Sequence, residues 1–78
     1  MDALKYYQLL NTITLNEFAP DAYRFYGVLD GEMVDGIYVV DHGVFVLSEE
    51  PEYDEHTMNL MAKVMQDKIE EQKEKENK

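Results

Sequence analysis

The sequence contains no cysteine and no tryptophan, and only two prolines and four glycines occur among its 78 residues. The absence of cysteine excludes a disulfide scaffold, a thiol nucleophile and a zinc site built on thiolates, and it fits a reducing cytosol. No apolar run approaches the roughly 18 residues that a membrane-spanning helix needs, and the N-terminal residues lack the apolar core of a signal peptide. We therefore expect a cytoplasmic protein without contact to a membrane.

Lysine and arginine are also scarce, because seven of them face seventeen aspartates and glutamates and leave a net charge of −10. Residues 1–62 hold twelve of these acids with Lys5 and Arg24 as their only cations, whereas residues 63–78 hold five acids and five lysines. Direct binding of nucleic acid is disfavoured, because contacts to phosphate require cations. The negative charge belongs to the body of the domain, and the C-terminal residues are balanced.

The acidic residues are densest between Asp30 and His56, a stretch that contains nine carboxylates and no lysine or arginine. Turns and helix starts explain some of these acids, since aspartate is common at both. The missing cations have no such explanation, because protein surfaces normally mix both signs and clustered like charge destabilises a compact fold. The pattern predicts a surface that binds a basic partner; the alternative is an acidic surface that is only solvated.

Length and composition favour one α+β domain over residues 1–70, followed by a charged tail over residues 71–78. Hydrophobic residues make up 45% of the chain, so the composition is not that of a disordered protein. A domain of this size buries only about 60% of the surface that its unfolded chain exposes, so binding or oligomerisation can supplement its stability. No apolar residue follows Ile69, and we expect the tail to continue the last helix and then fray.

A first helix is predicted over residues 3–13, where apolar residues recur at helical spacing and Asp2 can cap the N-terminus. Thr14 and Glu17 have the spacing of a capping box, which favours a second, short helical turn before Pro20. The predicted apolar face of the first helix consists of Leu4, Tyr7, Leu9 or Leu10, and Ile13.

The middle of the chain is rich in β-branched and aromatic residues and predicts an antiparallel meander of three strands, over residues 23–29, 32–40 and 44–48. Asp30-Gly31 is the favoured pair for a type I′ turn between the first two strands, because glycine accepts a positive φ. The sequence "DHG" predicts the next turn, either with His42-Gly43 as its two central residues or as a three-residue loop with Gly43 in the left-handed region. Asp35-Gly36 predicts a bulge inside the second strand, or a turn that divides it.

These predicted strands are apolar on both faces, unlike the alternating strands of an antiparallel sheet with one face in water. Two helices can cover only one face of such a sheet. The second face is therefore a candidate contact surface.

A last helix follows Asp54, which can cap it, and acids in its first turn suit the positive end of the helix dipole. Its methionines either fill the core or form an adaptable interface. The apolar stripe of this helix is formed by Thr57, Leu60, Met61, Val64, Met65, Lys68 and Ile69, with Met58 at its edge.

Neither a metal site nor a catalytic site is predicted. The calcium loop of an EF-hand places its ligands at fixed offsets from a glycine, and neither Gly31 nor Gly36 gives that pattern. His42 and His56 are far apart in the sequence and form no paired metal-binding motif. No two carboxylates are singled out as an acid and a base, and so small a domain rarely encloses a cleft. We expect no cofactor and no enzymatic activity.

The candidate binding residues are therefore the carboxylates together with neighbouring tyrosines, which favour interfaces. Tyrosines close to the acidic loops are expected to stay exposed and to serve as apolar anchors amid the charge. The predicted set comprises Asp30, Glu32, Asp35, Asp41, Glu49, Glu50, Glu52, Asp54 and Glu55, with Tyr26, Tyr38 and Tyr53.

In size and acidity the chain resembles small acidic inhibitors from phages and mobile elements, which include DNA mimics, anti-restriction and anti-CRISPR proteins and inhibitors of host polymerases. It is similar in the same way to immunity proteins and antitoxins that neutralise basic nucleases. The resemblance implies a non-enzymatic inhibitor or regulator that occludes a basic surface of a nucleic-acid-handling protein. The alternative is a structural or adaptor module that assembles with itself, as a homodimer for example, through the apolar sheet face and the methionine-rich helix.

Overall fold

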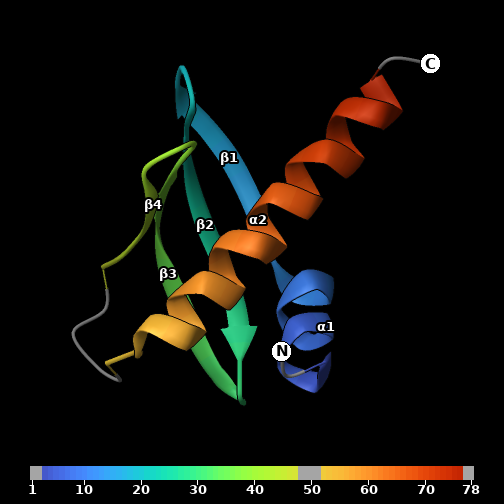
Figure 1. Cartoon of the computed structure of the whole chain (residues 1–78). Helices are drawn as coiled ribbons and strands as arrows, with labels where there is room; N and C mark the ends of the chain where they lie inside the picture. Colours follow the sequence, from blue (N-terminus) through green and yellow to red (C-terminus); the bar gives the residue numbers. More distant parts are fainter. Residues whose placement is uncertain (1–2, 48–51, 77–78) are drawn as a thin grey trace.

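The architecture comes from a computed structural model, which describes residues 3–47 and 52–76, with side chains as far as residue 74. Two helices flank a continuous run of strands, so the predicted α+β class is confirmed (Figure 1). The elements in chain order are α1 (Ala3–Thr12), β1 (Thr14–Ala19), β2 (Ala22–Leu29), β3 (Glu32–Val39), β4 (Gly43–Val46) and α2 (Glu55–Glu76).

The strands form one antiparallel sheet in the order β1-β2-β3-β4, in which each strand pairs with the next along the chain. Tight turns allow this order, because an aspartate in each turn adopts a positive φ: Asp21, Asp30 and Asp41. Gly31 follows with a φ of 81°, so the two central residues of the β2–β3 turn are both left-handed, as the type I′ turn predicted from the Asp-Gly pair requires.

The sheet has four strands, and the prediction of three was wrong because residues 14–19 form β1 instead of a short helical turn. The capping-box spacing of Thr14 and Glu17 is a local signal, and pairing with β2 overrides it. Leu15 lies opposite Phe25 in this pairing, and both side chains are buried. The edge strand thus contributes to the core, which a solvent-exposed helical turn would not do.

The predicted bulge or turn at Asp35-Gly36 is also wrong, because β3 pairs with β2 without a shift of register through this point. Gly36 is required there for a different reason. A Cβ atom on Gly36 would lie 2.2 Å from the carbonyl oxygen of Phe45 and 2.9 Å from two ring carbons of Phe25. The glycine therefore lets the Phe25 ring pack directly against the backbone of the neighbouring strand.

Both helices pack against the same face of the sheet, here called the inner face (Figure 1). The core lies between them and the sheet, and no charged or polar side chain of the described residues is buried in it. Its members are Leu9, Ile13, Leu15, Phe25, Leu29, Val34, Tyr38, Leu60, Met61, Val64, Met65 and Ile69.

The predicted apolar face of the first helix is confirmed in part, because Leu9 and Ile13 are buried in the core but the two residues nearest the N-terminus are not. Leu4 is 85% exposed and Tyr7 is also exposed, whereas Leu9 is fully buried and Leu10 packs against the core. A hydrogen bond from the Tyr6 hydroxyl to the carboxylate of Asp67 on α2 accompanies this orientation. Contact with α2 and β2 thus selects one of two apolar faces that the short helix offers.

The helix α2 follows the prediction closely. Its first turn is capped by Asp54, whose carboxylate accepts a hydrogen bond of 2.8 Å from the backbone N–H of Thr57. The buried members of the predicted stripe include Met61 and Met65, so these methionines fill the core and are not free to form an interface.

Candidate functional site

Five of the predicted carboxylates lie together at the end of the sheet where β2 turns into β3 and where α2 begins. We call this region the acidic end, and its members are Asp30, Glu32, Glu52, Asp54 and Glu55. Asp30, Glu32 and Glu52 border a shallow hollow of about 270 Å³, together with Lys5, Leu29, Tyr53 and Thr57. All five carboxylates are exposed to solvent. The fold thus assembles one anionic surface from two segments that are about twenty residues apart in the sequence.

Local interactions keep the carboxylate of Asp54 ionised. The hydrogen bond from the Thr57 backbone lowers the pKa of Asp54, and a hydrogen bond with the Thr57 side chain and the nearby His56 and Lys5 act in the same direction. The helix dipole at the start of α2 also favours negative charge here. The cap therefore contributes to stability and to the anionic surface at the same time.

Tyr53 also lines this hollow. Its hydroxyl is buried and has no hydrogen-bond partner among the described residues. Burial raises the pKa of Tyr53, and the negative charge of Glu32 raises it further. The ring is only partly buried and packs against the core, so it gives the acidic end an apolar wall.

The other predicted carboxylates do not join this surface. Asp35 lies on the opposite face of the sheet from the helices and forms an ion pair with Arg24, whose Nη2 is 2.9 Å from its Oδ2. Asp41 lies in the β3–β4 turn, at the far end of β3, and the length of the strand separates it from Asp30 by roughly 25 Å. Glu49 and Glu50 fall outside the described residues. The nine carboxylates thus do not act as one cluster.

The three tyrosines predicted as anchors do not lie together on one surface either. Tyr38 is only 2% exposed and belongs to the core, so its prediction as an exposed anchor was wrong. Its register opposite Tyr23 places it on the inner face, beneath the helices. Burial raises the pKa of Tyr38. Tyr26 is exposed on the other face, where the Arg24 guanidinium lies 4.6 Å from its ring centroid.

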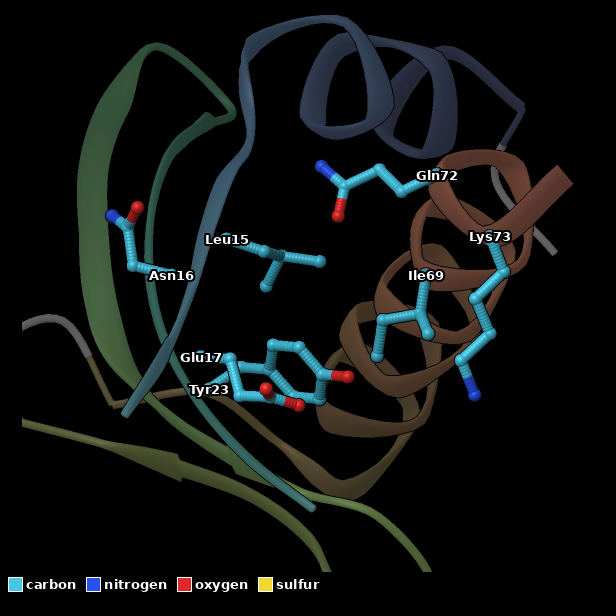
Figure 2. A pocket seen from close by; sticks show the side chains of 7 residues that line it. All are labelled: Leu15, Asn16, Glu17, Tyr23, Ile69, Gln72 and Lys73. Atoms are coloured by element: carbon cyan, nitrogen blue, oxygen red, sulfur yellow. The ribbon is translucent and has the colours of Figure 1, made fainter. Parts of the chain in front are cut away.

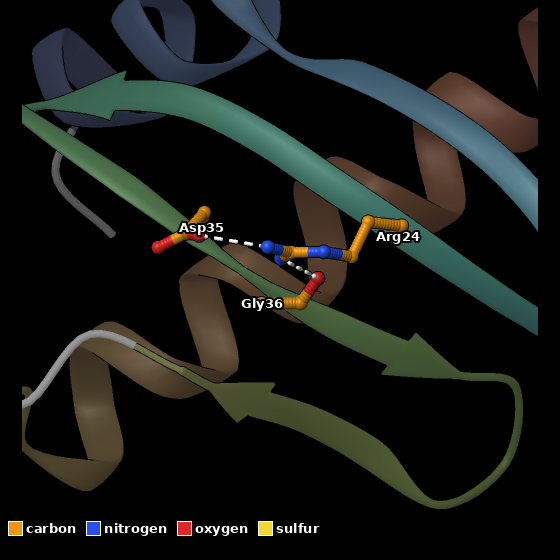
Figure 3. Close-up of polar contacts among 3 residues, drawn as sticks. All are labelled: Arg24, Asp35 and Gly36. Atoms are coloured by element: carbon orange, nitrogen blue, oxygen red, sulfur yellow. Dashed lines mark hydrogen bonds and ion pairs between the residues drawn. The ribbon is translucent and has the colours of Figure 1, made fainter.

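The face of the sheet that points away from the helices, here called the outer face, is the second candidate surface. Figure 3 shows it with α1 and α2 behind the strands and with the Arg24–Asp35 ion pair on it. Arg24 also donates a 3.0 Å hydrogen bond to the carbonyl oxygen of Gly36. By register and alternation, the apolar side chains of this face are Tyr26, Val28, Met33, Ile37, Val39, Phe45 and Leu47.

Within residues 3–47 and 52–76, neither α1 nor α2 covers the outer face, and its large side chains are exposed. Met33 is 75% exposed, and Tyr26, Phe45 and Leu47 are each exposed by about half. The prediction that two helices cover one face only is confirmed. The individual residues Met33, Phe45 and Leu47 were missed, although the two-sided apolar pattern of the strands was the signal that could have found them.

A further hollow of about 340 Å³ separates β1 from the C-terminal half of α2. Figure 2 shows Leu15 and Ile69 facing each other across it, with Tyr23 beside them. Asn16, Glu17, Gln72 and Lys73 also line it.

Within residues 3–47 and 52–76, no group of three or more histidine, aspartate or glutamate side chains is placed to hold a metal ion. In the same part of the chain, neither helix has the length and the apolar character that crossing a membrane requires.

Comparisons with protein-family models, with curated proteins and with solved structures gave no match for this chain.

Proposed function

We propose that the protein is a small non-enzymatic inhibitor or regulator that binds a basic surface of a nucleic-acid-handling protein through its acidic end. The observation that carries the proposal is the gathering of five exposed carboxylates at one end of the fold, where Lys5 is the only described cation in the bordering hollow. Occlusion of the basic surface then keeps nucleic acid away from it.

Electrostatic attraction is the driving force of this binding. Like charges gathered at one end create a field that steers a cationic partner toward it and raises the association rate. Such interactions weaken as salt shortens the Debye length. The partly buried Tyr53 adds apolar contact beside the carboxylates, as aromatic residues do at protein interfaces.

The positions of the acids favour end-on docking over imitation of a DNA strand. A mimic of DNA needs carboxylates repeated along an extended surface like phosphates, whereas Asp30 and Asp41 stand at opposite ends of β3 with an apolar face between them. The phage-type anti-defence role implied by composition fits either mode of binding. The immunity-type role fits end-on docking to a basic nuclease.

The test uses the immobilised chain to capture proteins from a bacterial lysate at about 0.05 M and at about 0.5 M salt. A triple variant, Asp30→Asn, Glu32→Gln and Glu52→Gln, removes three charges from the acidic end. The matched control, Glu17→Gln, Glu70→Gln and Glu74→Gln, removes three exposed charges elsewhere. Captured proteins are then assayed for DNA or RNA binding with and without the chain.

We expect the control to capture a basic nucleic-acid-binding protein as the unaltered chain does, and the acidic-end variant to lose it. High salt should weaken the capture, and the chain should compete with nucleic acid for the partner. Capture that is indifferent to salt and to the acidic-end variant, or a partner that binds nucleic acid equally well in the presence of the chain, would refute the proposal.

A further inference from the structure

The outer face is a large apolar surface on a chain that is otherwise strongly acidic. Arg24 and Asp35 are its only charged groups among the described residues, and they pair with each other. The carboxylates of the turns, such as Asp30 and Asp41, lie beyond the ends of the strands. A basic partner attracted by those carboxylates therefore gains no electrostatic energy from the outer face itself.

The area of this face is close to the lower limit of a specific dimer. The four strands lie about 4.8 Å apart and contain six, eight, eight and four residues of about 3.3 Å each, which gives a face on the order of 400 Å². Two such faces bury on the order of 800 Å², which is the size of a small and weak protein–protein interface. Apart from the Arg24–Asp35 ion pair the face is mostly apolar, and the largest apolar patch of a protein is often functional.

From these observations we propose that a second copy of this chain covers the outer face, so that two sheets pack face to face in a homodimer. Aligned sheets pack about 10 Å apart with interdigitating side chains, and Tyr26, Met33 and Phe45 supply side chains of the length this needs. The two helical layers lie on the outside of this sandwich. The proposal is independent of the basic partner, because it uses the opposite face of the sheet from the helices and not the acidic end.

The central ion pair is compatible with burial in such an interface. Arg24 bonds Asp35 and the Gly36 carbonyl oxygen and stacks on Tyr26, so both charges keep partners when water leaves. A buried charge without a partner would oppose association strongly. A second copy adds no unmatched charge to this face, because each copy carries the same pair.

Repulsion between two chains of net charge −10 limits the dimer. Their carboxylates lie at the rim of the interface, where salt screens them. We therefore expect the dimer to strengthen as salt rises, whereas capture of a basic partner should weaken. The two associations are distinguishable by the sign of their salt dependence.

The experiment is analytical ultracentrifugation of the full chain from about 10 µM to about 1 mM, at low and high salt. Phe45→Lys places a charge on the outer face at the edge strand β4, and Met33→Lys provides a second, more exposed position on β3. Leu4→Lys on α1 is the matched control, because it introduces the same charge at an exposed apolar side chain on the helical side of the molecule. Circular dichroism checks that each variant folds.

We expect the unaltered chain and Leu4→Lys to dimerise alike, and Phe45→Lys and Met33→Lys each to raise the dissociation constant about tenfold or more. Methyl resonances report the interface directly: dilution should shift the signal of Met33 and leave that of the fully buried Met61 in place. A chain that stays monomeric at the highest concentration and salt overturns the proposal and leaves the face to another protein. A dimer that both outer-face variants leave intact overturns it as well.

Discussion

Phe25 and Phe45 are the same residue type on the same sheet, yet Phe25 is 0% exposed and Phe45 is 54% exposed. Phe25 lies on the inner face beneath the helices, and Phe45 lies on the outer face opposite Ile37. Strand propensity accounts for both residues, because aromatic side chains favour strands on either face. The difference shows that α1 and α2 cover one face of the sheet, and that strand propensity alone does not tell which aromatic residues are buried.

The largest expected change in the free energy of unfolding comes from replacing the two phenylalanines, which tests the difference in their burial directly. Phe25→Ala removes a fully buried ring and should lower the free energy of unfolding by about 3–5 kcal/mol. Phe45→Ala should change it by less than about 1 kcal/mol in the monomer, because half of this ring is already in water. Urea unfolding followed by circular dichroism at low protein concentration measures both.

At high protein concentration the difference in stability between Phe25→Ala and Phe45→Ala should become smaller, because the proposed homodimer buries Phe45. The cost of Phe45→Ala should then rise while the cost of Phe25→Ala stays the same. Equal costs for the two variants at low concentration would show that the outer face is already covered within the monomer.

A smaller change in the free energy of unfolding is expected from the hydrogen bond that joins the two helices on the inner face. The Tyr6 hydroxyl on α1 donates a hydrogen bond to Asp67 on α2. This bond, with burial and the charge of Asp67, raises the pKa of Tyr6 to about 12. Because the neutral form is favoured in the folded state, the contribution of Tyr6 is complete below about pH 10, its unfolded value, and is lost as the pH rises toward about 12.

Tyr6→Phe should therefore lower the free energy of unfolding by about 1 kcal/mol at neutral pH and by less above pH 11. Tyr7→Phe is the control, because Tyr7 is an exposed neighbour on the same helix. The measurement is the urea midpoint of each protein between pH 7 and pH 12. A Tyr6→Phe deficit that stays constant over this range would mean that the bond to Asp67 does not contribute.

The features that followed from the sequence are those fixed by neighbouring residues. Asp30-Gly31 makes its turn through backbone conformations that few other pairs adopt, and Asp54 caps α2 with its own side chain. The stripe of α2 is also local, since a period of 3.6 residues defines one face of a long helix.

The features that the sequence did not show depend on distant partners. The capping-box spacing at Thr14 and Glu17 favoured helix, and only the pairing of Leu15 with Phe25 makes this segment a strand. The helix α1 is apolar on two sides, and only its contacts with α2 and β2 choose between them.

The sequence predicted only part of the candidate site, because the positions of its residues also depend on partners that are distant in the sequence. Successive turns of a meander lie at opposite ends of the sheet, so the topology separates Asp41 from Asp30 even though both belong to one acidic stretch of sequence. Alternation along β3 sends Tyr38 into the core and Asp35 to the outer face. Net charge per segment therefore overstates how many of these acids can meet one partner.

The smallest expected effect in the monomer concerns the ion pair on the outer face. With both side chains about one-third exposed, Arg24 and Asp35 should couple by about 0.5 kcal/mol in a double-mutant cycle that combines Arg24→Gln and Asp35→Asn. Urea unfolding of the four proteins at low concentration gives this value, and added salt should reduce it.

In the proposed homodimer the same pair is buried. Each single substitution then leaves an unpaired charge in the interface and should weaken dimerisation, whereas the double variant leaves no charge and should recover much of the affinity between the two copies. A coupling that remains near 0.5 kcal/mol at concentrations where the chain dimerises would mean that the pair stays in water, and the outer face would then not be the surface that the second copy covers.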